Sequence, residues 1–107
     1  MSKRSADLLL DDSREAIEKI GRITADLSLD GVMADEKTQD AVVRNLEIIG
    51  EAANRLPQEF KAQLADIEWP KIVGLRHRIV HDYFGIDLKI IWRIINEDLR
   101  VFKAQLQ

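Results

Sequence analysis

The apolar residues of this chain recur every three or four positions over most of its length, which is the spacing of one face of an α-helix. No run of β-branched residues alternates with a period of two, and only two prolines and five glycines interrupt the helical pattern. A chain of 107 residues can bury one hydrophobic core but is too short for a second. We therefore predict an all-α protein in which residues 1–107 form a single domain.

Caps and helix breakers place the helices in the first half of the chain. The first helix is expected from about Ser5 to Leu27, with a break at residues 28–31. The second is expected from about Asp35 to Arg55 and is ended by Pro57, because proline cannot continue a helix. A short helix over Gln58–Leu64 is expected to follow.

Two further long helices complete the predicted bundle of four long helices and one short one. The third opens at Trp69-Pro70, since proline is tolerated in a first turn, and it ends near Tyr83-Phe84, with Gly85 as its C-terminal stop. Asp87 is expected to cap the last helix. The predicted buried stripe of this helix consists of Leu88, Ile91, Trp92, Ile95, Leu99, Phe102 and Leu106.

A second apolar set in the last helix lies off that stripe and comprises Ile90, Ile94 and Val101. A helix that is apolar on more than one side is buried on more than one side. We expect a second copy of the chain to cover this extra face, so the predicted assembly is a homodimer.

Charge and composition narrow the classes of function. The net charge of −3 argues mildly against indiscriminate nucleic-acid binding, but residues 70–107 carry seven basic and four acidic side chains, whereas residues 1–69 carry nine and fifteen. No cysteine is present, which excludes disulfides and thiolate metal sites. The apolar run Leu8-Leu9-Leu10 is too short for a signal peptide or a membrane span, so the expected location is the cytoplasm.

One segment, Arg76-His77-Arg78-Ile79-Val80-His81-Asp82-Tyr83, contains both histidines and the only tyrosine of the chain. Three interpretations stay open from the residues alone. His77 and His81 have the spacing of paired zinc ligands, although no third ligand is evident. Alternatively His81 is a helix C-terminal histidine and the arginines pair with nearby acids. In the third interpretation Arg76 binds a phosphate, His81 transfers a proton and Tyr83 positions the substrate.

Helix geometry separates the groups of this segment. Arg76 and Tyr83 are seven residues apart and share a face, whereas Arg76 and His81 are roughly 140° apart around one straight helix. Either the helix distorts, or the segments of two copies face each other across a dimer. In the second case the arginine of one copy completes a cleft with the histidine of the other.

The pattern Arg76-x4-His81-x-Tyr83 resembles the signature of HEPN-domain proteins, specifically the HepT-like toxin family. The resemblance extends from about Leu8 to Leu106. It includes Trp69, Phe84-Gly85-Ile86-Asp87 and Trp92, and upstream Arg44-Asn45 and Ile48-Ile49-Gly50-Glu51-Ala52. One departure is His77, because the residue after the motif arginine is often asparagine in that family.

The resemblance implies a dimeric helical bundle and a metal-independent ribonuclease that uses no cofactor. Arg76 and His81 would be catalytic, and the substrate would be RNA rather than DNA. The partner would be a minimal nucleotidyltransferase antitoxin that attaches AMP to Tyr83. The alternative is a non-catalytic subunit that binds a nucleotide or the transferase, and His77 keeps this alternative open.

Three other residues are candidates for substrate binding or for support of the catalytic pair, namely His77, Arg78 and Glu51. Glu51 is interpreted in two ways: it orients Arg76 or His81, or it pairs with Arg55 on an exposed helix face. Trp69 and Trp92 are expected to pack in the core rather than to stack on bases.

Overall fold

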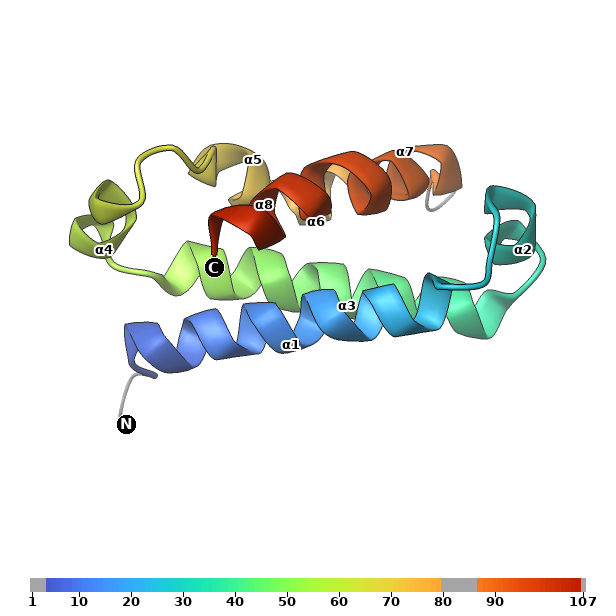
Figure 1. The fold of residues 1–107 in the computed structure, drawn as a ribbon, viewed down its shortest axis with the longest axis horizontal. Coiled ribbons are helices and arrows are strands. Elements are labelled where there is room, and N and C mark those ends of the chain that lie inside the picture. Colours follow the sequence, from blue (N-terminus) through green and yellow to red (C-terminus); the bar gives the residue numbers. More distant parts are fainter. Residues whose placement is uncertain (1–3, 80–86, 107) are drawn as a thin grey trace.

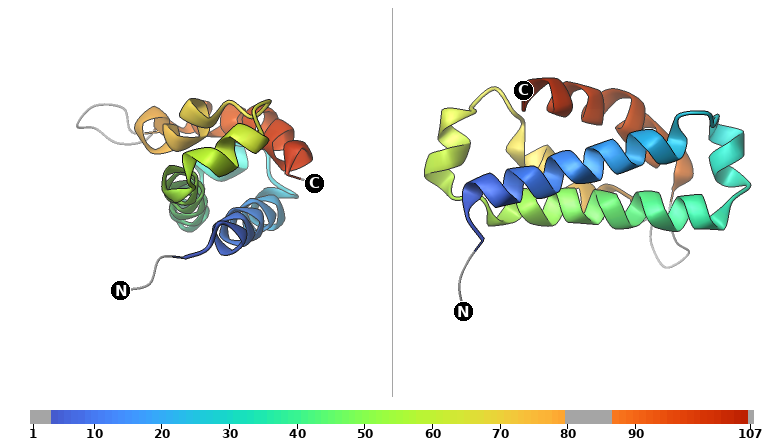
Figure 2. Two further views of the ribbon diagram at one scale, coloured as in Figure 1. Left: turned by 90° about the vertical axis from the view of Figure 1, so that its left-hand side faces the viewer. Right: turned by 60° about the horizontal axis from the view of Figure 1, so that its bottom comes forward.

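The computed structural model describes residues 4–79 and 87–106, without the side chain of Arg76. Figure 1 shows helices in two layers, and the end-on view in Figure 2 separates them. One layer consists of the antiparallel helices α1 (Ala6–Thr24) and α3 (Glu36–Arg55). The other consists of α5 (Trp69–Val73), α6 (Leu75–Ile79), α7 (Leu88–Arg93), the π-helical segment η2 (Ile94–Asp98) and α8 (Leu99–Gln105). The described residues contain no strand, so the predicted all-α class is confirmed.

The longest two helices begin where the sequence predicts, with Ser5 as the predicted cap of α1 and Asp35, the predicted start of α3, as its observed cap. The Ser5 hydroxyl accepts a hydrogen bond from the Leu8 backbone N–H at 3.2 Å, and the Asp35 carboxylate accepts one from the Lys37 N–H at 3.0 Å. Such side-chain acceptors satisfy backbone donors that lack a partner in the first turn of a helix. The prediction for α3 is accurate to one residue, whereas α1 ends at Thr24, three residues before Leu27.

Two short helices lie at opposite ends of the molecule (Figure 1): residues 29–33 join α1 to α3 within one layer, and residues 58–63 lead from α3 to the other layer. The predicted short helix is confirmed as α4 (Gln58–Gln63). The predicted break at residues 28–31 is wrong, because α2 (Leu29–Met33) occupies most of it. The Ser28 side chain accepts a hydrogen bond from the Gly31 N–H at 3.3 Å and so starts a helix where we expected a loop.

The third long helix is not continuous. It begins at Trp69 as predicted, but Gly74 ends α5, and α6 starts at Leu75. Gly74 has a ψ of 3°, far from the helical value of about −42°. Glycine is a poor helix former, so a break here is locally inexpensive. The predicted end at Tyr83-Phe84 and Gly85 lies outside the described residues.

The last helix starts at Asp87 as predicted, and its carboxylate accepts hydrogen bonds from the N–H groups of Lys89 and Ile90 at 3.0 and 3.2 Å. The π-helical turn η2 then changes which residues face the core. Ile94 and Leu99 are five residues apart and both are buried, because a π turn brings residues i and i+5 onto the same face. Placing Ile94 on an extra outer face was therefore wrong: its exposed fraction is 0%. Val101 of the same set is 58% exposed.

The buried side chains of both layers form one hydrophobic core. Trp69 lies in it and packs edge to face against Phe102, with ring centroids 5.9 Å apart. The Trp69 indole N–H donates to the carbonyl oxygens of Lys61 and Leu64, both at 3.2 Å. The prediction that Trp69 belongs to the core is confirmed. None of the helices in the described ranges has the length and apolar character needed to cross a bilayer.

Candidate functional site

The motif helix α6 carries Arg76 and is fixed to the core by Leu75 and Ile79, which are both fully buried. The helix packs against α3 on one side and α7 on the other. Asp87 is the first described residue after α6, and its N–H donates to the Ile79 carbonyl oxygen at 3.3 Å. The two residues that flank residues 80–86 are therefore in direct contact. His81 and Tyr83 lie outside the described residues, as does the side chain of Arg76.

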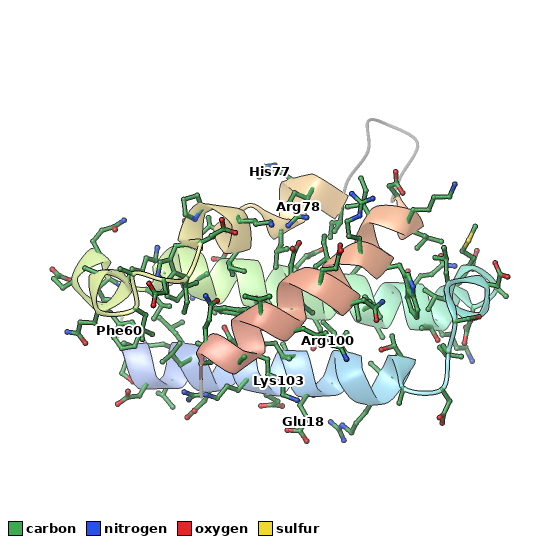
Figure 3. All side chains as sticks on the ribbon, turned by 45° about the horizontal axis from the view of Figure 1, so that its top comes forward. Glu18, Phe60, His77, Arg78, Arg100 and Lys103 are labelled. Atoms are coloured by element: carbon green, nitrogen blue, oxygen red, sulfur yellow. The ribbon has the colours of Figure 1, made fainter. Side chains whose placement is uncertain are left out.

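His77 and Arg78 leave α6 in different directions (Figure 3). His77 is exposed, whereas Arg78 is partly buried and places its Nη1 atom 2.7 Å from Oδ2 of Asp98 in η2. The two residues therefore have different surroundings. His77 is open to a solute, while Arg78 already faces a carboxylate of its own chain.

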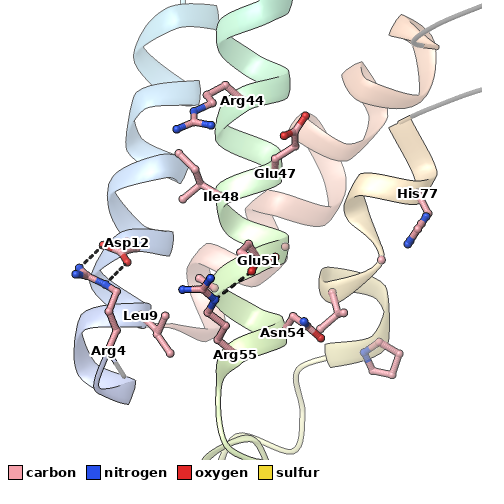
Figure 4. A pocket seen from close by; sticks show the side chains of 15 residues that line it. Arg4, Leu9, Asp12, Arg44, Glu47, Ile48, Glu51, Asn54, Arg55 and His77 are labelled. Atoms are coloured by element: carbon pink, nitrogen blue, oxygen red, sulfur yellow. Dashed lines mark hydrogen bonds and ion pairs between the residues drawn. The ribbon is translucent and has the colours of Figure 1, made fainter. Parts of the chain in front are cut away.

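His77 lies at the border of a groove of about 740 Å³ that follows α3 between α1 and the helices α5 and α6. Figure 4 shows this groove from close by. Its side chains come from the start of the chain, from one face of α3 and from the α5–α6 junction, and they include Arg4, Asp12, Arg44, Glu47, Glu51, Asn54, Arg55 and His77. The groove is thus lined by residues far apart in the sequence, with the motif helix forming part of its border.

The charges in the groove are mixed, and most of its guanidinium groups contact carboxylates. Arg4 holds Asp12 through two hydrogen bonds of 2.8 and 2.9 Å, and Arg55 donates to Glu51 at 3.0 Å. Among the described residues, no carboxylate pairs with Arg44, whose guanidinium group points into the space beside α1 (Figure 4). Exposed ion pairs of this kind are weak, so an anionic ligand could compete for these arginines.

Glu51 satisfies one of the two interpretations given above and leaves the other open. Its carboxylate pairs with Arg55, four residues on, and both side chains are more than half exposed. Both residues nevertheless line the same groove as His77. The structure therefore brings Glu51 and His77 to one surface, but it gives Glu51 a basic partner within its own helix.

The groove residues Arg4, Asp12, Glu47 and Asn54 were not identified from the sequence. In the sequence, Asp12 lies in the first predicted helix and Arg4 just before it, and neither stands out as a site residue. No local sequence pattern indicates that α1 lies beside α3. Two other groove residues were noted in the sequence: Arg44 as part of the family resemblance, and Arg55 as a partner of Glu51. Their shared surface depends on tertiary packing.

The described residues contain no group of three or more His, Asp or Glu side chains that could hold a metal ion. The pair His77 and His81, which has the spacing of zinc ligands, is not covered by this statement, because His81 lies outside the described residues. Within the described part, the groove presents three arginines, three carboxylates and His77, so its lining alone favours neither an anion nor a cation.

Comparisons with known proteins give one consistent result. A family model for HepT-like ribonucleases matches residues 13–107. The chain is 38% identical over 105 residues to "Probable ribonuclease HepT" of Thermococcus cleftensis, covering 98% of this chain and 96% of that protein. It is 34% identical over 107 residues to "Putative RNase MJ1380" of Methanocaldococcus jannaschii, covering 100% and 98%. No solved structure matches the chain significantly. Since the family model and these relatives cover almost the whole sequence, the chain belongs to the HepT-like ribonuclease family.

Proposed function

We propose that this protein is a metal-independent RNA endonuclease in which Arg76 and His81 are the catalytic residues. The observation that carries the proposal is the match to HepT-like ribonucleases along nearly the full chain, in a sequence that has the Arg76-x4-His81-x-Tyr83 pattern. The position of Arg76 on α6, a helix that borders the groove, supports it. The groove offers arginines to the flanking phosphates of an RNA strand.

The proposed reaction is attack of an RNA 2′-hydroxyl on the adjacent phosphorus. His81 accepts the proton of that hydroxyl, the new O–P bond forms, and the bond to the 5′-oxygen of the next nucleotide breaks as that oxygen gains a proton. Arg76 stabilises the negative charge that increases on the phosphoryl oxygens in the transition state. RNA supplies its own nucleophile in this scheme, so the protein has to position groups and move protons.

We further propose that the protein is the toxin of a toxin–antitoxin pair and acts as a homodimer. Its antitoxin would be a minimal nucleotidyltransferase that silences it by attaching AMP to Tyr83. These proposals come from the family resemblance, together with the angular separation of Arg76 and His81 on one helix.

The test of the catalytic proposal is an RNA cleavage assay in EDTA. We expect the parent chain to cleave, and we expect Arg76→Ala and His81→Ala to lose ~10²–10⁴-fold in rate. Arg100→Ala, which removes an exposed arginine from α8, is the matched control and should cleave like the parent. Equal cleavage by all four proteins would show that the residue assignment is wrong.

The same assay separates this proposal from its alternatives. Activity that is lost in EDTA and restored by zinc would favour a metal site at His77 and His81. A parent chain that binds a nucleotide or the transferase but cleaves no RNA would favour the non-catalytic subunit.

A further inference from the structure

Asp98 in η2 joins two helices that the sequence predicts to be one. Its Oδ2 atom lies 2.7 Å from Nη1 of Arg78 in α6, and its Oδ1 atom lies 3.2 Å from Nζ of Lys71 in α5. Lys71 and Arg78 stand on opposite sides of the break at Gly74. One carboxylate therefore contacts the helix before the break and the helix after it.

The contact with Arg78 is the shielded half of this cluster. The side chain of Asp98 is 11% exposed and that of Arg78 is 30% exposed, whereas Lys71 is 44% exposed. The two contacting atoms, Nη1 and Oδ2, are shielded from solvent and neither has a hydrogen-bond partner among the described residues, so their contact is an ion pair. Loss of Asp98 would leave the shielded Nη1 atom of Arg78 without the carboxylate that faces it, which is costly for a charged group.

The π turn explains why an aspartate occupies this position. In a regular α-helix, residue 98 would follow Ile94 by one turn and would point into the core. The five-residue step from Ile94 to Leu99 gives the core position to Leu99 and moves Asp98 to the edge that faces α5 and α6. The irregular turn thus directs a carboxylate at the motif helix.

We propose that Asp98 is a positioning residue that sets the orientation of α6, and with it Arg76, by holding Lys71 and Arg78 across the Gly74 break. Arg76 is two residues before Arg78 in a helix of only five residues, so a rotation of α6 would displace both. Displacement of a catalytic group by about 1 Å can cost on the order of 10²-fold in rate. The kinetic part of this proposal rests on the proposed ribonuclease function.

The experiment compares Asp98→Asn with Glu97→Gln. Glu97 is the neighbouring acid in η2, and its pair with Arg93 is exposed and 3.7 Å long, which makes it the matched control. The first readout is hydrogen exchange by mass spectrometry, which needs no enzymatic activity. We expect faster exchange in residues 69–79 of Asp98→Asn, unchanged exchange in α1, and no change in Glu97→Gln. Equal exchange in the two variants, or acceleration of similar size in α1, would overturn the positioning role.

The second readout is cleavage of a mixed-sequence RNA pool that carries a fluorophore and a quencher. We expect the kcat of Asp98→Asn to fall by about 10- to 100-fold with little change in KM. In an Arg76→Ala background the same change should cost little more, because Asp98 acts through the position of α6. A full additional loss in that background would contradict the proposal.

The two readouts separate the possible failures. If the parent chain cleaves no RNA, the proposed function fails while the exchange data still decide the structural claim. If Asp98→Asn does not fold, Lys71→Gln removes the exposed half of the cluster and should produce the same local change at smaller size. Unchanged exchange in Lys71→Gln would then overturn the proposal.

Discussion

Gly50 of α3 faces the carbonyl oxygen of Val73 in α5 so closely that a Cβ atom added to Gly50 would lie 3.4 Å from it. The carbonyl oxygen of Ile72 would be 3.5 Å away. Both neighbours belong to the backbone and cannot rotate out of the way. The α5 end that precedes the motif helix therefore rests directly on α3, beside Glu51 in the groove.

We predict that Gly50→Leu lowers the free energy of unfolding by about 1–3 kcal/mol, because the side chain would push α5 away from α3. Gly50→Ala should be milder, since a single methyl group would make ordinary contacts at these distances. Urea denaturation followed by circular dichroism measures both effects.

The control for this change is Gly21→Leu. Gly21 is exposed in α1, and an added Cβ there would have no neighbour within 4 Å. Since leucine is a better helix former than glycine, this variant should be more stable than the parent by roughly 0.5–1 kcal/mol. A similar loss of stability at both positions would contradict close packing at Gly50.

The cap of α3 predicts a dependence of stability on pH. The Thr38 hydroxyl donates to the Asp35 carboxylate at 2.9 Å, and this bond, together with backbone N–H donors, lowers the pKa of Asp35 from its ordinary value of 3.8. A carboxyl group with a lowered pKa stabilises the folded state fully above its unfolded pKa. That stabilisation is lost as the pH falls through the pKa of the folded state.

Asp35→Asn keeps an oxygen acceptor at the cap but cannot be protonated in this range. We therefore expect the parent to exceed this variant in stability at pH 6, and we expect the difference to shrink as the pH falls below 3.8. Thermal unfolding of both proteins at a series of pH values gives the comparison. The other carboxylates titrate in both proteins, so their contributions to the stability difference cancel. A stability difference that grows at low pH would contradict the predicted direction.

The sequence predicted the parts of this fold that depend on local signals. Ser5, Asp35 and Asp87 mark helix starts through side chains that bond to nearby backbone donors, and Pro57 marks an end. The break at Gly74 and the π turn could not be predicted in the same way. A single glycine does not by itself predict a break, and a period of three to four residues cannot reveal the single step of five from Ile94 to Leu99.

The same distinction between local sequence signals and tertiary packing applies to the candidate site. Sequence spacing identified Arg76, His77 and Arg78 as one segment, but helix phase alone did not show that His77 borders a groove while Arg78 contacts Asp98. Arg4, which precedes α1, and Arg44 of α3 reach that groove because α1 and α3 pack side by side. Proximity of this kind is set by tertiary packing, which has no signature in a short stretch of sequence.

Burial of Ile94 changes the argument for the proposed homodimer. Of the three residues first assigned to an outer face, Val101 remains the exposed one, and Ile90 is partly buried.

We still predict a homodimer, with a mass of twice 12.3 kDa in light scattering at micromolar concentration. Val101→Asp should weaken it if this face is the contact, whereas Met33→Asp changes an apolar residue of α2 that is 49% exposed and should not. A monomeric parent would contradict a site in which the arginine of one copy completes a cleft with the histidine of the other.

The last prediction concerns silencing by the proposed antitoxin. An AMP group attached to the Tyr83 hydroxyl would carry a negative phosphate and an adenine. If Tyr83 shares a helical face with Arg76, as a spacing of seven residues predicts, this phosphate would compete with the RNA phosphate for Arg76. Incubation with the partner transferase and ATP should therefore raise the intact mass by one AMP and abolish cleavage, without unfolding the protein. Tyr83→Phe should escape both effects, because it lacks the hydroxyl. If Tyr83→Phe is silenced like the parent, inhibition proceeds by another route, such as formation of a complex with the transferase.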